Sequence, residues 1–250
     1  MTTEDRDYTP FEEIMNDGET RSSHLPIWQE TGLLLLGAII LAVIIKSFFV
    51  QAFYIPSGSM EPTLMVNDRI LVEKPSYWFG HPQRGDIVVF KDPGGWLGPG
   101  EDSQPGNLLT EGLAKIGLYP EGGHLVKRVI GVPGDVISAD PKTGRIEVNG
   151  HPIDESGYAV GDDKGCFGPM PGKCDWTSGV VPKGELFVMG DNRAHSADSS
   201  YHLCMPTELD CSKTPWVDES LVVGKVVAEV WPMSRFKILH RPSDFNALPQ

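Results

Sequence analysis

The stretch TGLLLLGAIILAVII, residues 31–45, holds fifteen consecutive residues without a charge, most of them Leu, Ile, Val or Ala. Counted with its flanks it reaches about twenty residues, and a helix of that length crosses roughly 30 Å of hydrocarbon. Lys46 lies near one end, where its long side chain can reach the lipid headgroups. Trp28 precedes the stretch and Phe53 and Tyr54 follow it, as suits aromatic residues at the two membrane interfaces.

We therefore predict a transmembrane anchor over residues 31–52, between an acidic tail at 1–30 and a separate domain at 53–250. Two other interpretations stay open. A cleaved secretion signal could end near residues 50–52, although such signals begin with a short basic segment and the first thirty residues here hold eight acidic and two basic ones. The stretch could also be a buried core helix, although such a helix does not need an apolar surface that is uniform on all sides. Basic residues flank both ends, so charge does not decide the orientation.

The composition of the whole chain favours many short strands. Its 250 residues include 28 Gly and 21 Pro, a share of about 20% against a background of roughly 12%. Such a share excludes a helical bundle or coiled coil and stays below that of disordered or collagen-like chains. The net charge of −13 argues against a nucleic-acid-binding surface, which needs clustered Lys and Arg.

The pattern after the anchor predicts a mainly β domain. Short runs rich in β-branched residues occur at 69–73, 86–90, 125–130, 145–148, 151–153, 185–189 and 222–230. Asn149-Gly150 between two of them is a strong signal for a type I′ hairpin. Strands at this spacing favour a sandwich or a coiled antiparallel sheet that forms a partly closed barrel.

Two Gly- and Pro-rich segments, 92–123 and 154–182, interrupt the strands, and we predict loop insertions there. The first includes a short amphipathic helix near residues 109–116. The four cysteines form two closely spaced pairs and allow three disulfide connectivities. We favour local pairing, 166 with 174 and 204 with 211, which would place the domain outside the cytoplasm.

The segment IPSGSMEPTL, residues 55–64, is the first with chemical potential. Its two prolines forbid a regular helix, so an extended, rigid backbone is expected. Ser57 and Ser59 would then point to the same side, and Gly58 between them would let a substrate backbone approach closely. Taken alone, the segment also fits an ordinary Ser-Gly-Ser turn. A serine needs a base before it is a nucleophile.

Lys127 is the candidate base, because strand alternation places it on the face of Leu125 and Val129, with Arg128 on the other face. A lysine among apolar neighbours loses hydration, so its pKa falls and it can be neutral near pH 7. The alternative is a lysine that protects an edge strand from aggregation.

A third segment, residues 189–199, combines carboxylates, hydroxyls and a guanidinium after a clean strand. Ser196 could orient a base, and Asp191 could pair with Arg128. Its Asp and Asn residues could equally satisfy backbone groups in turns.

Together with residues 84–90, these three segments resemble the ordered sequence boxes of bacterial type I signal peptidases. The resemblance runs from the anchor to about residue 199, with a weaker continuation at 222–232. It implies a Ser/Lys endopeptidase that removes signal peptides from exported preproteins, with its N-terminus cytoplasmic and its catalytic domain outside. No cofactor or metal is implied, and the partners are preproteins and the lipid bilayer.

The resemblance also assigns residues. It implies Ser59 as nucleophile, Lys127 as general base, the Ser57 hydroxyl and Ser59 N–H as oxyanion donors, and Ser196 as the group that orients the lysine. The implied substrate pocket, for small side chains, comprises Phe53, Ile55, Met60, Leu64, Leu125 and Val126. Arg128, Asp191 and Asp198 are supporting residues.

One position departs from the family pattern, since Ser200 stands where many relatives have arginine. The ion pair that this arginine forms must be absent or taken over, and Arg193 is the expected substitute.

Other readings of the site remain. His124, His195 and His202 lie near the candidate segments and offer a rival base. A Ser/Lys self-cleaving regulator would not explain the anchor. A non-enzymatic anchored β-domain that binds partner proteins is a further alternative, and it would explain the anchor. Residues 77–79 and 96–97 could add a surface that dips into the membrane interface, or could pack in the core.

Overall fold

The computed structural model describes residues 26–98, 123–161, 175–204 and 211–249. Its contacts divide the chain into two units, Met1–Ile40 and Leu41–Gln250. Helix α1, Ile27–Phe48, is the part of the described chain that is long and apolar enough to cross a membrane, and its window Ile27–Ile45 buries no residue. It begins four residues before the predicted span and ends four residues earlier, because residues 50–52 belong to a strand.

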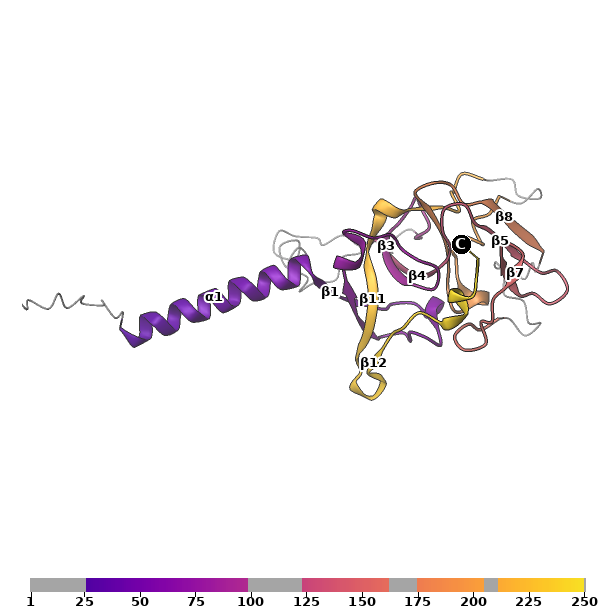
Figure 1. The fold of residues 1–250 in the computed structure, drawn as a ribbon. Coiled ribbons are helices and arrows are strands. Elements are labelled where there is room, and N and C mark those ends of the chain that lie inside the picture. The colour runs from indigo at the N-terminus through magenta and orange to yellow at the C-terminus, as the bar shows by residue number, and fades with distance from the viewer. Residues whose placement is uncertain (1–25, 99–122, 162–174, 205–210, 250) are drawn as a thin grey trace, which may run out of the picture. The chain divides into compact units, whose positions relative to one another are not determined.

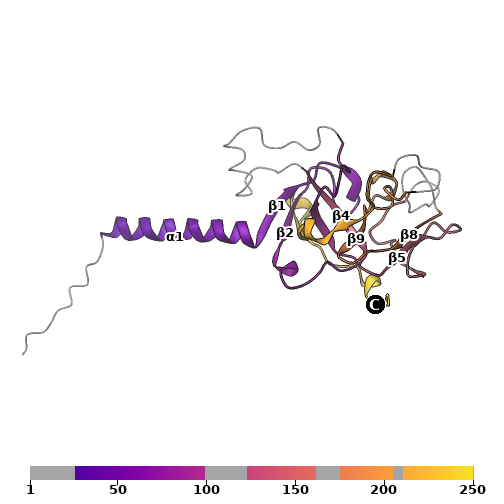
Figure 2. The same cartoon turned by 90° about the horizontal axis from the view of Figure 1, so that it is seen from above.

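The larger sheet has eight strands in the order β1-β2-β11-β3-β4-β9-β10, with β12 paired to β11 (Figure 1). The strands are β1 (Val50–Tyr54), β2 (Arg69–Glu73), β3 (Ile87–Lys91), β4 (His124–Gly131), β9 (Glu185–Met189), β10 (Val217–Asp218), β11 (Val222–Trp231) and β12 (Lys237–Ile238). All of these pairings are antiparallel. The second sheet, in the order β7-β6-β5-β8, contains β5 (Val136–Ala139), β6 (Ile146–Val148), β7 (His151–Pro152) and β8 (Trp176–Val180) (Figure 2).

Strand β3 shows why the sheet is covered on both sides. Its sequence IVVFK is apolar without alternation, and its first four residues are buried. Ile87 and Val89 point into one core cluster, whereas Val88 and Phe90 point into another. A continuous apolar run is what a strand buried on both faces requires. The sheets curl without closing, so the prediction of a mainly β, coiled antiparallel fold is confirmed.

Most strand predictions from the sequence agree with the structure. Strands β2 and β9 have the predicted bounds, and five others differ by one residue at one or both ends. The hairpin between β6 and β7 is confirmed, since Asn149 and Gly150 have φ of 54° and 76° and Val148 pairs with His151. Both φ values lie in the left-handed region that a type I′ turn needs.

Other expectations need correction. Strand β8 lies inside the segment predicted as an insertion, 154–182, and its Trp176 belongs to a core cluster with Tyr158 and Val181. The ends of that segment therefore complete the second sheet and its core, while residues 162–174 lie outside the described residues. The predicted helix near residues 109–116 also lies outside them.

The aromatic residues suggested for a membrane-dipping surface divide into two groups. Trp96 is buried, donates its indole N–H to the carbonyl of Thr214 and stacks on His202, so it is a core residue. Trp78 and Phe79 are exposed, Phe79 by 98%.

Of the two predicted disulfides, Cys204–Cys211 is present. The pair 166 and 174 lies outside the described residues.

Candidate active site

Ser59 and Lys127 meet although 68 residues separate them in the sequence. Lys127 lies on β4 opposite Val88 of β3, and Ser59 lies in a single 3₁₀ turn, Gly58–Met60. Lys127 Nζ donates a hydrogen bond of 2.7 Å to Ser59 Oγ. The backbone is extended at Ser57 but turns at Gly58, so the predicted extended path through the whole motif was wrong. The turn still brings the two serine hydroxyl oxygens within 3.5 Å of each other.

Lys127 is 3% exposed, and burial lowers its pKa from 10.5 to about 8. The cause is desolvation, because an ammonium group loses more hydration on burial than a neutral amine does. The nearby carboxylates of Asp198 and Asp191 oppose this shift by favouring the protonated form. The amine is therefore poised between its two protonation states slightly above neutral pH.

The loop after β9 packs directly on the segment that holds Ser59. A Cβ atom at Gly190 would lie 2.4 Å from the carbonyl oxygen of Ser59 and 2.3 Å from Ser196 Oγ, so only glycine fits. The backbone N–H of Asn192 donates to the Ser59 carbonyl at 3.1 Å, and its side-chain Nδ2 donates to the Gly58 carbonyl at 3.0 Å. The main chain on both sides of the Gly58–Ser59 bond is thus held by Asn192.

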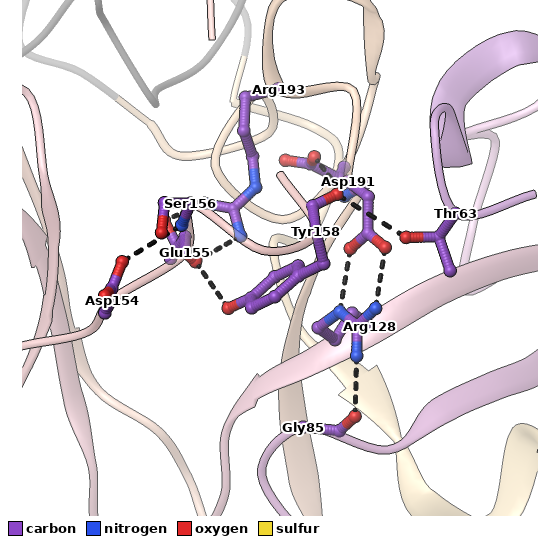
Figure 3. Close-up of polar contacts among 11 residues, drawn as sticks. Thr63, Gly85, Arg128, Asp154, Glu155, Ser156, Tyr158, Asp191 and Arg193 are labelled. Carbon is purple, nitrogen blue, oxygen red and sulfur yellow. Dashed lines mark hydrogen bonds and ion pairs between the residues drawn. The ribbon is translucent and has the colours of Figure 1, made fainter. Parts of the chain in front are cut away.

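Arg128 forms the expected ion pair with Asp191 behind the lysine (Figure 3). Arg128 Nε and Nη2 donate to the two oxygens of Asp191 at 2.8 and 2.7 Å, and Nη1 donates to the Gly85 carbonyl at 3.0 Å. The guanidinium also lies 4.2 Å from the ring centre of Tyr158, a cation–π distance. Both partners of the pair are almost fully buried. A bidentate ion pair shielded from water therefore joins β4 to the loop after β9.

Arg193 does not replace the arginine expected at Ser200. It forms a buried bidentate pair with Glu155, with distances of 2.9 and 2.5 Å (Figure 3). Asp198 instead accepts bonds from Ser200 itself, N–H at 3.0 Å and Oγ at 2.6 Å, and from the N–H of Gly190 at 2.8 Å. The expectation for Arg193 was wrong because the short Ser200 side chain can bond Asp198 locally.

Ser196 is fully buried beside Gly190, and its Oγ has no hydrogen-bond partner among the described residues. The structure thus brings Ser196 next to the site without a hydrogen bond to Lys127. The hydroxyl remains available to a neutral amine or a bound group.

The six predicted pocket residues occupy two kinds of place. Ile55, Met60 and Leu64 are at most 2% exposed and belong to one core cluster, against which Phe53 and Val126 pack while half-buried. Leu125 is also half-buried, and it packs against the neighbouring cluster.

The three histidines have other neighbours. The ring of His124 packs against Phe53, and His202 stacks on Trp96. His195 Nδ1 lies 3.1 Å from Asn192 Oδ1. Ser59 Oγ instead receives its bond from Lys127, which favours the lysine over these rings as the base.

Reasoning from the sequence missed Glu155, Tyr158 and the side-chain role of Asn192. The first two lie in a Gly-rich segment interpreted as an insertion, and the arginines that they contact, Arg193 for Glu155 and Arg128 for Tyr158, are distant in the sequence. The Asn192 bond to Gly58 joins residues 134 apart, and no local pattern signals it.

Several known proteins resemble this chain. A family model described as "Signal peptidase, peptidase S26" matches residues 28–231. A probable signal peptidase I of Mycobacterium leprae is 38% identical over 84% of this chain and 78% of its own length. Signal peptidase I of Mycobacterium tuberculosis is 35% identical over 88% and 78%. A crystal structure of a signal peptidase I from Enterococcus faecalis covers 58% of this chain and 95% of its own, with 23% identity and a TM-score of 0.35.

The family model and the two mycobacterial relatives define the class: the protein is a hydrolase of the serine protease type. More narrowly, the chain belongs to the signal peptidase family, peptidase S26.

Proposed function

We propose that the protein is a membrane-anchored serine endopeptidase that removes N-terminal signal peptides from exported preproteins with a Ser59/Lys127 dyad. The observation that carries the proposal is the 2.7 Å hydrogen bond from a buried lysine amine to a serine hydroxyl. A serine hydroxyl is a weak nucleophile until a positioned base takes its proton. A lysine serves as that base once burial has brought its pKa near the working pH.

The reaction follows from these groups. Neutral Lys127 takes the proton of Ser59 as Oγ attacks the scissile carbonyl, and a tetrahedral oxyanion forms. The Ser59 N–H and the Ser57 hydroxyl are the donors for that oxyanion, and each such donor contributes roughly 2.7–4 kcal/mol in serine proteases. Lys127 then gives the proton to the leaving amine. A water that Lys127 deprotonates releases the acyl group from Ser59.

Substrate recognition would use the half-buried residues around the dyad. Phe53, Leu125 and Val126 can contact the substrate directly, while the buried Ile55, Met60 and Leu64 would form the floor beneath them. We expect this apolar surface to accept small side chains near the cleavage site. Ser196 would orient the neutral amine of Lys127 through its hydroxyl, which has no partner within the described part of the chain.

Helix α1 supplies the membrane anchor in this proposal. Its 22 residues extend about 33 Å at 1.5 Å per residue, enough to span the hydrocarbon of a bilayer. The acidic tail, now residues 1–26 because α1 begins at Ile27, would then be cytoplasmic and the β domain extracytoplasmic. The Cys204–Cys211 disulfide supports that placement, because disulfides persist in oxidising compartments.

The full-length protein in detergent, given a synthetic signal-peptide substrate, tests the proposal. We expect cleavage by the wild type and a loss on the order of 10⁶-fold in Ser59→Ala. Ser76→Ala removes the same hydroxyl from an exposed serine outside the site and should cleave like the wild type. His124→Ala should retain most activity, because that residue is not the proposed base.

Persistent cleavage by Ser59→Ala would overturn the proposed nucleophile. An inactive wild type that still binds preproteins would instead favour the non-enzymatic anchored domain.

A further inference from the structure

The side chain of Asn192, 134 residues beyond Gly58 in the sequence, holds the peptide unit that joins Gly58 to Ser59. Asn192 Nδ2 donates to the carbonyl oxygen of Gly58 at 3.0 Å. This carbonyl belongs to the same peptide unit as the N–H of Ser59. In the proposed reaction that N–H is one of the two oxyanion donors, so Asn192 touches the oxyanion site from behind.

Because the peptide bond is planar, this contact also fixes the direction of the Ser59 N–H. The Gly58–Ser59 bond is trans, and in a trans unit the C=O and N–H vectors are antiparallel and rigidly coupled. Fixing the direction of the Gly58 carbonyl therefore fixes the direction of the Ser59 N–H. A hydrogen bond accepted by the carbonyl also polarises the peptide unit, which makes its N–H a stronger donor.

Asn192 is itself held on several sides. Its Oδ1 lies 3.1 Å from His195 Nδ1, which directs the NH₂ end of the amide toward Gly58. Its main chain forms a bridge with Val160, whose N–H donates to Asp191 O and whose carbonyl accepts from Arg193 N, both at 2.8 Å. The buried pair between Arg193 and Glu155 fixes that bridge in turn.

We propose that Asn192 is a positioning residue for the oxyanion hole, acting through the Gly58 carbonyl to aim and polarise the N–H of Ser59. This inference rests on the proposed peptidase function and deepens it. The competing explanation is that Asn192 only stabilises a turn.

Other contacts let the two explanations be separated. The carbonyl of Gly58 also accepts from the N–H of Glu61 at 3.2 Å, and the carbonyl of Ser59 accepts from the backbone N–H of Asn192. Both bonds survive any non-proline substitution at position 192. The 3₁₀ turn and its attachment to the loop after β9 therefore persist when only the amide group is removed.

The test compares the wild type with Asn192→Ala and with Asn192→Asp, which keeps the shape but replaces the NH₂ donor by an oxygen. Asn246→Ala removes the same group at an exposed position in the C-terminal segment and serves as control. We expect kcat to fall about 10- to 100-fold in both 192 variants, somewhat less than loss of a direct oxyanion donor, while KM stays within about twofold.

Two further readouts distinguish positioning from a structural role. The affinity for a peptide boronic acid, which forms a tetrahedral adduct with the serine, should fall by the same factor as kcat. The affinity for the product peptide and the pH midpoint of activity in Asn192→Ala should stay unchanged, because Lys127 is not altered. If Asn192→Ala unfolds at a lower temperature, the isosteric Asn192→Asp decides the question by the kcat and boronate measurements.

Unchanged kcat in both variants would overturn the inference, as would a loss of kcat without a matching loss of boronate affinity. Ser59→Ala, measured in parallel, separates this failure from a failure of the proposed function. A wild type that cleaves, an inactive Ser59→Ala and fully active 192 variants would refute the role of Asn192 alone. Cleavage that survives in Ser59→Ala would refute both.

Discussion

The amine of Lys127 shows how one buried residue can set the chemistry of a site. Removal from water lowers its pKa to about 8, against the opposing charges of Asp198 and Asp191. Neutralising both carboxylates would lower the pKa further, and exposing the amine would restore its ordinary value. The site thus balances desolvation against nearby negative charge, and the amine can be a base near neutral pH.

The pH dependence of cleavage follows from this balance. Because the pKa of Lys127 in the folded protein is about 8, below the ordinary 10.5, the fraction of neutral amine increases as the pH rises toward 8. Deprotonation is nearly complete one pH unit above that value. We expect kcat/KM of the full-length enzyme to rise about tenfold per unit below the midpoint and to level off above it. Rate measurements on a synthetic substrate from pH 5 to 10 check this, and a flat profile would exclude Lys127 as the base.

At the scale of elements, two buried charge pairs connect strand β4, the loop after β9 and the segment after β7. The pair of Arg128 with Asp191 and the pair of Arg193 with Glu155 share Tyr158, which stacks on the first guanidinium and donates its hydroxyl to Glu155 at 3.0 Å. This cluster joins the three pieces of chain through side-chain contacts (Figure 3).

Removing one partner of a buried charge pair should destabilise the protein more than replacing both partners by apolar residues. In Glu155→Ala the guanidinium of Arg193 is left buried without its partner, and we expect a loss of about 3–5 kcal/mol in the free energy of unfolding. Urea unfolding of the full-length protein in detergent measures this loss. The double variant Glu155→Leu with Arg193→Met should recover much of it, because neither position then carries a buried charge. A double variant less stable than Glu155→Ala would contradict this explanation.

For the whole molecule, the boundary between helix α1 and the β domain lies further toward the N-terminus than residue 53, the start of the domain predicted from the sequence. Residues 50–54 form β1, which pairs with β2 over five positions, from Val50 with Glu73 to Tyr54 with Arg69. Phe49 packs its ring against Trp78 at 5.3 Å, and its carbonyl accepts from the N–H of Lys74 at 3.0 Å. The β domain therefore needs the chain from about residue 49.

Two truncations test this boundary together with the anchor. A chain that starts at residue 49 should fold with near full-length stability of the β domain and leave the membrane fraction on a carbonate wash, whereas the full-length protein should remain. A chain that starts at residue 55 lacks β1 and should lose about 3 kcal/mol or more, from about five strand hydrogen bonds. Equal stability of the two truncations, or release of the full-length protein by carbonate, would contradict these assignments.

Local patterns in the sequence determined much of this protein. The apolar span gives α1, alternation and β-branched runs give β2, β4 and β9, and Asn149-Gly150 gives its hairpin, because each of these depends on neighbours within a few residues. The order of the motifs pointed to Ser59 and Lys127 as partners. Strand β8 escaped prediction because WTSGV is weakly apolar, and β1 because it follows an apolar helix without a break.

Only the tertiary structure decided how the site is held together. The 2.7 Å contact of Lys127 with Ser59, the choice of Glu155 by Arg193 and the contact of Asn192 with Gly58 each join residues at least 38 positions apart. Such contacts depend on which strands pair and on how far the packed strands exclude water from the side chains. No local sequence pattern encodes the pairing or the burial. The lowered pKa of Lys127 is likewise a property of the assembled core, because desolvation exists only after the sheet has formed.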